Sequence, residues 1–260
     1  MRLILHADDF GTSADTVRAT IECFEQGVLT SASIMPGMPA TAEATAFARA
    51  HPELDFGVHL TFVGDEHERP LSPADEIPAL VASSGRFRAT RNLRIRALFH
   101  RLPVEQIERE LVRQVEAIRQ EGVEVTHVDS HRHLHKLPSF RQALERALPR
   151  LGIRRVRAVQ DVFLKRPLTS PTYWLGPRWQ RRLARAFATT DHFYMPTSAG
   201  DTGWERRLAE IAQRLRGGTL EVGVHPGFDS WRDGERTSLV CFAALARDGG
   251  HELIAWKDLT

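Results

Sequence analysis

The stretch LILHADDFG at residues 3–11 is an apolar run that ends in two adjacent aspartates and a glycine. Such a run predicts a buried strand, and acidic residues directly after it predict a functional site at the carboxyl end of that strand. Apolar or β-branched runs of this kind recur along the chain. Strands are expected near residues 2–7, 28–35, 55–62, 123–129, 153–158, 192–195, 219–225 and 252–256.

Segments of helical period separate these strands. One of them, PVEQIERELVRQVEAIRQEG, begins at Pro103 and ends at Gly122, which is the placement of proline and glycine that helices favour. Further helices are expected at residues 13–27, 138–152, 204–218 and 235–250. The alternation of strands and helices predicts a parallel sheet of the α/β class.

The number of strand–helix units narrows the choice among α/β folds. There are seven or eight such units in 260 residues, and neither a GxGxxG nor a GxxxxGK[ST] phosphate-binding loop is present. We therefore expect a distorted (β/α) barrel of about seven parallel strands rather than an open sheet. One domain is expected over residues 1–260, with an irregular, proline-rich insertion near 64–95.

Composition limits the classes of function. A net charge of +2 gives no general reason to expect nucleic acid as a partner. No apolar stretch approaches the ~20 residues that span a bilayer, and the run after Met1 meets acids instead of a cleavage site, so a cytoplasmic protein is expected.

Residues 154–185 are far more basic than the rest and include Tyr173, Trp174 and Trp179. The favoured interpretation is a solvated helix face whose tryptophans pack inward or line a sugar site. Contact with an anionic membrane surface is a better alternative than nucleic acid.

Carboxylates and imidazoles gather where four of the predicted strands end. In a parallel barrel these ends meet at one face of the molecule, where active sites lie. A single histidine at a strand end is as often structural as functional, but the joint appearance of several favours a site. The residues are Asp8, Asp9, His59, Asp129, His131, His133, His135 and His225.

Two adjacent carboxylates repel one another unless a cation neutralises one or the other keeps a proton, so the pair suits a metal ligand beside a general base. His131, His133 and His135 share a face in an extended segment, and His131 and His135 share one in a helix, so either conformation suits ligation. One carboxylate with two imidazoles leaves positions for water and substrate. Metal-dependent hydrolases and non-haem iron oxygenases both use this arrangement.

The motifs ADDFG, GVH around His59, THVDSHRHLH and GVHPG together resemble the YdjC-like (ChbG) carbohydrate deacetylase family. The resemblance implies a distorted (β/α) barrel and one divalent metal ion, with zinc or magnesium as first choices and manganese or cobalt as others. It also implies removal of acetyl groups from N-acetylated amino sugars. Residues 27–37 and 75–88 are similar to a subgroup associated with hopanoid biosynthesis, whose substrate would be a sugar carried on a lipid, such as hopanoid-linked N-acetylglucosamine.

The same resemblance implies roles for individual residues. Asp9, His59 and His131 would hold the metal. Asp8 would be the catalytic base, and His225 the general acid. Residues around the site that orient other groups or bind substrate would be Asp129, His133, His135 and Arg155. His6 receives no role.

Two other functions remain open from the sequence. The same ligands suit a different metal-dependent hydrolase of amides or esters on a similar barrel. A carbohydrate-binding protein without catalysis is the second, although the intact set of acids and histidines speaks against it. The sequence also leaves a homodimer open.

Overall fold

The computed structural model describes residues 1–65, 68–196, 203–215 and 217–260. All eight predicted strands are confirmed, and all except the first are shorter than expected. The strands are β1 (Arg2–Phe10), β2 (Ser31–Ile34), β3 (Phe56–Leu60), β4 (His127–Ser130), β5 (Arg155–Val156), β6 (His192–Tyr194), β7 (Thr219–Val224) and β8 (Glu252–Leu253).

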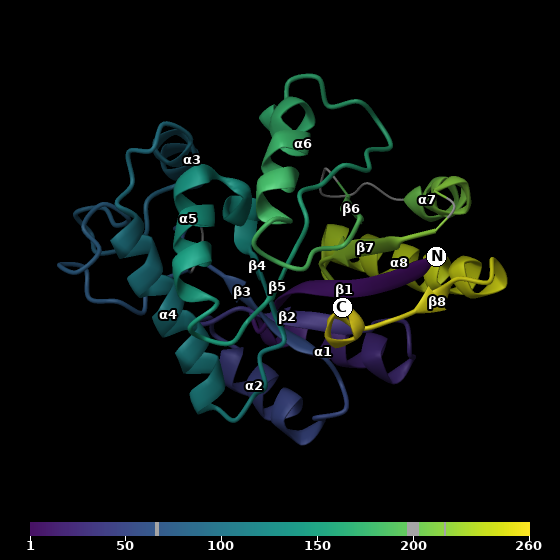
Figure 1. Ribbon diagram of the computed structural model, residues 1–260. Coiled ribbons are helices and arrows are strands. Elements are labelled where there is room, and N and C mark those ends of the chain that lie inside the picture. The colour runs from purple at the N-terminus through teal and green to yellow at the C-terminus, as the bar shows by residue number, and fades with distance from the viewer. Residues whose placement is uncertain (66–67, 197–202, 216) are drawn as a thin grey trace.

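Seven of these strands form one curled parallel sheet in the order β5-β4-β3-β2-β1-β7-β6. The short strand β8 pairs with Arg2 and Leu3 at the start of β1. Helices surround the curled sheet (Figure 1). The expected α/β fold, a distorted barrel of parallel strands, is confirmed.

The two ends of the sheet, β5 and β6, approach each other through a few backbone hydrogen bonds. The N–H of Val156 donates to Ala188 O at 3.0 Å, and the N–H of Val162 donates to Phe193 O at 3.2 Å. These bonds hold the carboxyl ends of all seven strands around one opening.

The five helices expected from the sequence are present, and three more accompany them. The confirmed helices are α1 (Ala14–Glu25), α4 (Val104–Gln120), α5 (Pro138–Ala147), α7 (Trp204–Arg214) and α8 (Ser230–Asp248). The additional helices are α2 (Thr41–Ala50), α3 (Thr90–Leu98) and α6 (Pro171–Leu183). Two short 3-10 segments are η1 (His131–Lys136) and η2 (Trp256–Asp258).

Helix α3 begins at Thr90, within the last residues of the segment 64–95 that the sequence predicts as an irregular insertion. Only Leu93 and Ala97 of this helix are buried, so it lacks the apolar stripe by which an amphipathic helix is usually recognised.

Strand β1 lies in the middle of the sheet, between β2 and β7. Leu3, Ile4 and Leu5 are fully buried, because neighbouring elements cover both faces of the strand. At the amino ends of the strands, the buried ring of Trp256 stacks on His127 with centroids 5.2 Å apart. The C-terminal segment thus covers one end of the barrel and leaves the functional end at the other.

In the described part of the chain, no helix combines the length and apolarity that crossing a membrane requires.

Candidate active site

The two adjacent aspartates reach one site because β1 is irregular at its carboxyl end. In a regular strand, successive side chains point to opposite faces. Here the register with β2 shifts between Ala7 and Phe10, and Asp9 has a left-handed φ of 61°. An irregularity of this kind re-aims one side chain, at some cost in backbone strain. Both carboxylates are therefore buried and line the same cleft.

This cleft has a volume of about 320 Å³ and lies at the carboxyl ends of the strands. It brings together residues from β1, β3, η1 and the segment after β7. The predicted site residues that line it are Asp8, Asp9, His59, His131, His133 and His225.

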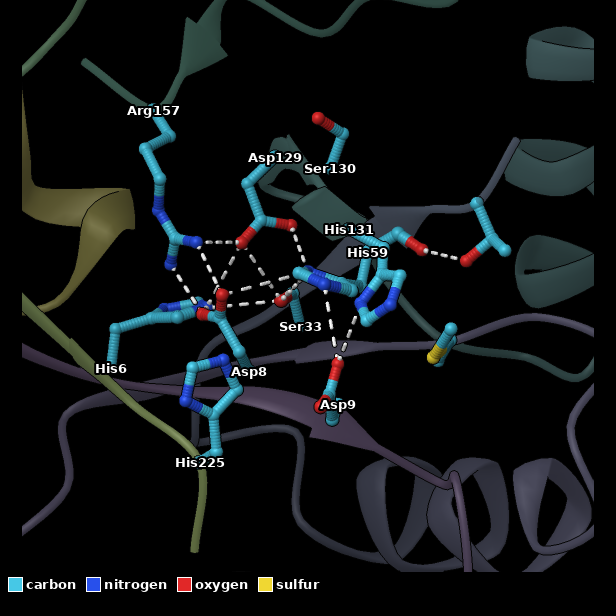
Figure 2. Close-up of polar contacts among 12 residues, drawn as sticks. His6, Asp8, Asp9, Ser33, His59, Asp129, Ser130, His131, Arg157 and His225 are labelled. Carbon is cyan, nitrogen blue, oxygen red and sulfur yellow. Dashed lines mark hydrogen bonds and ion pairs between the residues drawn. The ribbon is translucent and has the colours of Figure 1, made fainter. Parts of the chain in front are cut away.

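Asp9, His59 and His131 form a group that fits a metal ion. His59 Nε2 lies 3.4 Å from Asp9 Oδ1, and His131 Nδ1 lies 3.2 Å from the same oxygen. Figure 2 shows the two imidazoles turned towards Asp9. One ligand atom from each residue lies within 4.8 Å of the other two, and one oxygen with two nitrogens is a donor set used by catalytic metals. The other carboxylate oxygen of Asp9 accepts a hydrogen bond from Arg232 at 2.8 Å.

A second group of potential ligands, His6, Asp8 and Asp129, lies next to the first. Its two carboxylates already face the guanidinium of Arg157. Arg157 contacts both carboxylates of this second group, whereas Arg232 contacts Asp9 through Oδ2 and leaves Oδ1 facing His59 and His131, so the group around Asp9 is the better place for a metal ion.

Asp129 orients His59. The carboxylate Oδ1 of Asp129 lies 2.9 Å from His59 Nδ1, which leaves Nε2 to face Asp9. Burial lowers the pKa of His59, but the charges of Asp129 and Asp8 and the hydrogen bond outweigh it and raise that pKa to about 9. A carboxylate behind a histidine in this way is typical of metal ligands. The negative field that favours a proton on His59 also favours a metal cation beside it.

Arg157 was assigned from the sequence only to the basic segment, yet it is the central cation of the site. It is fully buried and makes a two-pronged contact with Asp8, from Nη1 to Oδ2 at 2.7 Å and from Nη2 to Oδ1 at 2.6 Å. Nη1 also lies 2.6 Å from Asp129 Oδ2, and Nε donates to Glu221 at 2.8 Å. Burial opposes its charge, but Asp129, Asp8 and Glu221 raise the pKa of Arg157 above its usual range.

Arg155 does not lie at the cleft. Its Nε donates to Leu259 O and its Nη2 to Lys257 O, both at 2.8 Å, so it holds the C-terminal segment at the opposite end of the barrel. Arg157, two residues further along the chain, occupies the position at the carboxyl end of the strand. The sequence RRVR offers several arginines, and only the exact end of the short strand β5 distinguishes them.

His225 is paired with Glu235 of α8. Its Nδ1 lies 3.0 Å from Glu235 Oε2, and the same oxygen accepts the backbone N–H of His225 at 2.9 Å. Burial disfavours the charged imidazole, but the hydrogen bond and charge of Glu235, together with Asp9 and Asp8, raise the pKa of His225. The protonated form of this imidazole is therefore favoured more than in a free histidine. No signal in the sequence near Glu235 indicates this role, since the residue lies inside a helix far along the chain.

The three histidines of the HRHLH motif, His131, His133 and His135, point to different places. Arg132 and His133 have left-handed φ values of 57° and 53°, so η1 is neither an extended segment nor a regular helix. His133 lines the cleft, whereas His135 is buried with its Nδ1 2.8 Å from Ser130 Oγ. Of the three, only His131 faces Asp9.

His6 lies beneath the cleft as a bridge between two hydroxyls. Its Nδ1 is 2.8 Å from Ser31 Oγ, and its Nε2 is 3.1 Å from Ser33 Oγ. Burial, and next the charge of Arg157, lower the pKa of His6 well below its usual value, so this imidazole is neutral. Ser33 Oγ also lies 3.1 Å from Asp129 Oδ2, which ties His6 to the carboxylate behind His59.

The arrangement has the parts of a hydrolytic site. A group suited to a metal lies beside a carboxylate, Asp8, that is held in place by Arg157, and an imidazole with a raised pKa lies in the same cleft. These are the groups that a base, a Lewis acid and a general acid would need to attack a carbonyl and release an amine.

Comparison with known proteins agrees with this arrangement. A carbohydrate deacetylase of Geobacillus stearothermophilus is 33% identical over 228 residues, which cover 86% of this chain and 79% of that protein. A carbohydrate deacetylase of Homo sapiens is 28% identical, with 88% and 76% covered. The crystal structure of an Enterococcus faecalis V583 protein named for cellobiose-phosphate cleavage shares the fold, with a TM-score of 0.83 at 22% identity over all of this chain and 98% of that one. A family model described as YdjC-like protein matches residues 2–253, and the chain therefore belongs to the YdjC-like family.

Proposed function

We propose that this protein is a metal-dependent deacetylase that hydrolyses the acetamide of an N-acetylated amino sugar to acetate and a free amine. The observation that carries the proposal is the meeting of Asp9, His59 and His131 beside the separately held carboxylate of Asp8. Relatives named carbohydrate deacetylases support the class of substrate.

Asp9, His59 and His131 would hold one divalent ion, and two imidazoles among three ligands favour zinc over magnesium, which prefers oxygen donors. When bound, such an ion polarises the acetamide carbonyl and makes water easier to deprotonate.

The protein's own residues would move the protons. Asp8 takes a proton from the attacking water, and the two-pronged contact with Arg157 fixes the direction of this carboxylate. His225, held by Glu235, gives a proton to the nitrogen that leaves the tetrahedral intermediate. Water supplies the hydroxyl of acetate, the carbon–nitrogen bond breaks, and the amino sugar departs as the amine.

We further propose that the sugar is carried on a lipid, as in the hopanoid-linked substrate that the subgroup resemblance implies. Apolar side chains around α6 and α3 support it because they are exposed: Leu168 is 60% and Trp174 64% exposed, and Ile95 is 47% exposed. Arg178 and Arg182 are also exposed on α6. Apolar side chains among arginines are suited to contact with an anionic membrane surface.

The roles of the two aspartates are separable by mutation. We expect Asp8→Asn to retain the bound metal and lose turnover, about 100-fold or more, because a general base is removed. We expect Asp9→Asn to lose the metal as well as turnover. The measurements are metal content of the purified protein and acetate release from N-acetylglucosaminyl substrates after chelation and re-addition of Zn²⁺, Mg²⁺, Mn²⁺ or Co²⁺.

Asp248→Asn is the matched control, since Asp248 is exposed at the end of α8 and does not line the cleft. Near-normal turnover in Asp8→Asn would refute the assignment of the base. Metal-independent acetate release by the unaltered protein would refute the metal-dependent mechanism.

A further inference from the structure

A second cavity opens beside the catalytic cleft. It has a volume of about 450 Å³ and is bounded by α3, the junction of η1 with α5, the segment before α6, and α6 itself. Arg94, His133 and Pro196 line both spaces, so the cavity and the cleft share a wall. A ligand whose sugar lies in the cleft can therefore extend into the cavity.

Most of the cavity wall is apolar. Leu98, Leu137, Phe163 and Trp179 contribute to it, together with three prolines. The ring of Phe163 packs edge-on against Tyr173 with centroids 5.7 Å apart, which fixes one side of the space. A wall of this kind favours a hydrocarbon group over a second sugar, whose hydroxyls would lose hydrogen bonds to water on entering it.

Two cationic side chains, Arg94 and Lys136, lie in this largely apolar wall. Lys136 is partly buried, and its Nζ donates to Thr172 Oγ1 at 2.8 Å. Within residues 1–65, 68–196, 203–215 and 217–260, no carboxylate lies within ion-pair distance of this ammonium group. Burial, and next the charge of Arg94, lower the pKa of Lys136 to about 7.

An ammonium group has three N–H donors, and Thr172 accepts one of them. A buried donor without a partner is costly, and a buried cation without a counter-charge is more so. An anionic oxygen in the cavity could accept a second hydrogen bond from Nζ of Lys136, beside the one that Thr172 accepts, and would favour the charged form of this amine.

We propose that this second cavity binds the aglycone of the substrate, a hydrocarbon chain joined to the sugar through an anionic oxygen group such as a phosphate ester, with Lys136 as its cationic contact. The proposal rests on the deacetylase function proposed above for the identity of the sugar. Binding of a ligand in the cavity can be measured without any sugar.

Binding of n-hexyl phosphate to the full chain tests the cavity directly, with n-hexanol and inorganic phosphate as the two halves of the probe. By isothermal titration calorimetry, we expect the Kd of hexyl phosphate to be at least about tenfold lower than the Kd of n-hexanol or of inorganic phosphate. In Lys136→Met, hexyl phosphate should bind no better than hexanol, whereas Lys257→Met, a lysine outside the cavity, should bind it as the unaltered protein does.

A second pair of variants tests the apolar wall in case Lys136→Met folds poorly. Phe163→Ser is expected to weaken hexyl phosphate binding by about tenfold, because the chain loses its contact with the ring. Phe99→Ser is the control, since Phe99 is 63% exposed and does not line the cavity. Equal binding of hexyl phosphate and inorganic phosphate, or equal effects of the two serine variants, would overturn the proposal.

Kinetics then separate this proposal from the deacetylase function. With methyl N-acetylglucosaminide and the hexyl-phosphate-linked sugar as substrates, kcat/KM should be higher for the second, and Lys136→Met should reduce this ratio by about tenfold. Acetate release with no preference between the two substrates would refute the aglycone site and leave the deacetylase standing. Lys136-dependent binding of hexyl phosphate without acetate release from either substrate would refute the deacetylase and leave the cavity as an anionic lipid site.

Discussion

Arg157 carries one positive charge among three buried carboxylates, those of Asp8, Asp129 and Glu221. Burial, with the charges of Asp129 and Asp8, raises the pKa of Glu221 to about 7 in spite of Arg157. Near neutral pH the group therefore gains from any further cation, and a metal at Asp9 would supply it. The three acids come from three strands, β1, β4 and β7, and Arg157 together with such a metal would balance their charges.

The pair of His225 and Glu235 predicts a change in the pH profile. A general acid must be protonated, so activity falls as pH rises through its pKa. Glu235 raises the pKa of His225, and Glu235→Gln should therefore move the alkaline fall in kcat to lower pH, by about one unit. The measurement is kcat for acetate release across pH 5–10.

Glu25→Gln, on the exposed face of α1, is the control and should leave the profile in place. An alkaline fall at the same pH in Glu235→Gln and the unaltered protein would show that His225 does not act as the acid.

Which site residues can be found from the sequence depends on what the local pattern reveals. Asp9, His59 and His131 accompany apolar runs, so the sequence alone predicts their position near strand ends. The structure brings the three side chains together. Arg157 follows a strand of two residues among several arginines, and Glu235 lies inside a helix. Their contacts come from strand order and helix packing, which no local pattern encodes.

At the scale of the element, the irregularity in β1 is what makes adjacent acids useful. The segment that follows it is held by α2: the N–H of Ala40 donates to Gly11 O at 3.0 Å, and Gly11 has a φ of +100°. A Cβ atom at Gly11 would lie 3.2 Å from Thr41 Cα and 3.3 Å from Ala44 Cβ. Only glycine fits both the backbone conformation and the close approach of the helix.

Gly11→Ala is therefore expected to be destabilising and to lower turnover, because α2 or the end of β1 must move. Gly152→Ala is the matched control, with a φ of +71° and no atom within 4 Å of the added Cβ. We expect Gly11→Ala to cost about 2 kcal/mol more than the control in urea unfolding. Equal losses in the two variants would mean that the contact with α2 contributes nothing.

The apolar pattern of each strand or helix determines whether the sequence predicts it. Apolar runs locate every strand, because a parallel sheet covered on both faces demands them. Helix α3 has little apolar surface, and α6 carries Pro177 in its interior, so the sequence gives only a weak helix signal for either. The tryptophans of the basic segment divide accordingly: Trp179 packs inward as expected, whereas Trp174 is exposed.

At the scale of the whole molecule, the exposed apolar side chains of α6 and α3 predict binding to vesicles. The protein should cosediment with vesicles that contain anionic lipid and less with neutral ones, and added salt should weaken the binding. Replacing Leu168 and Trp174 by serine should reduce the bound fraction by at least about fivefold.

Leu245→Ser, a substitution at a partly exposed leucine on α8, is the control and should bind as the unaltered protein does. Binding that is the same for anionic and neutral vesicles, or unaffected by the double replacement, would exclude this surface as the membrane contact.

The central place of β1 also affects how the protein is made. Arg2 of this strand pairs with Thr219 of β7, which is synthesised long after it. Until then the apolar residues Leu3, Ile4 and Leu5 have no neighbour on one edge of the strand, which exposes this edge to wrong pairing and makes it a target for chaperones. Asp8 likewise meets Glu221, through Arg157, only after β5 and β7 have been translated. The site therefore cannot be completed before β7 has joined the sheet.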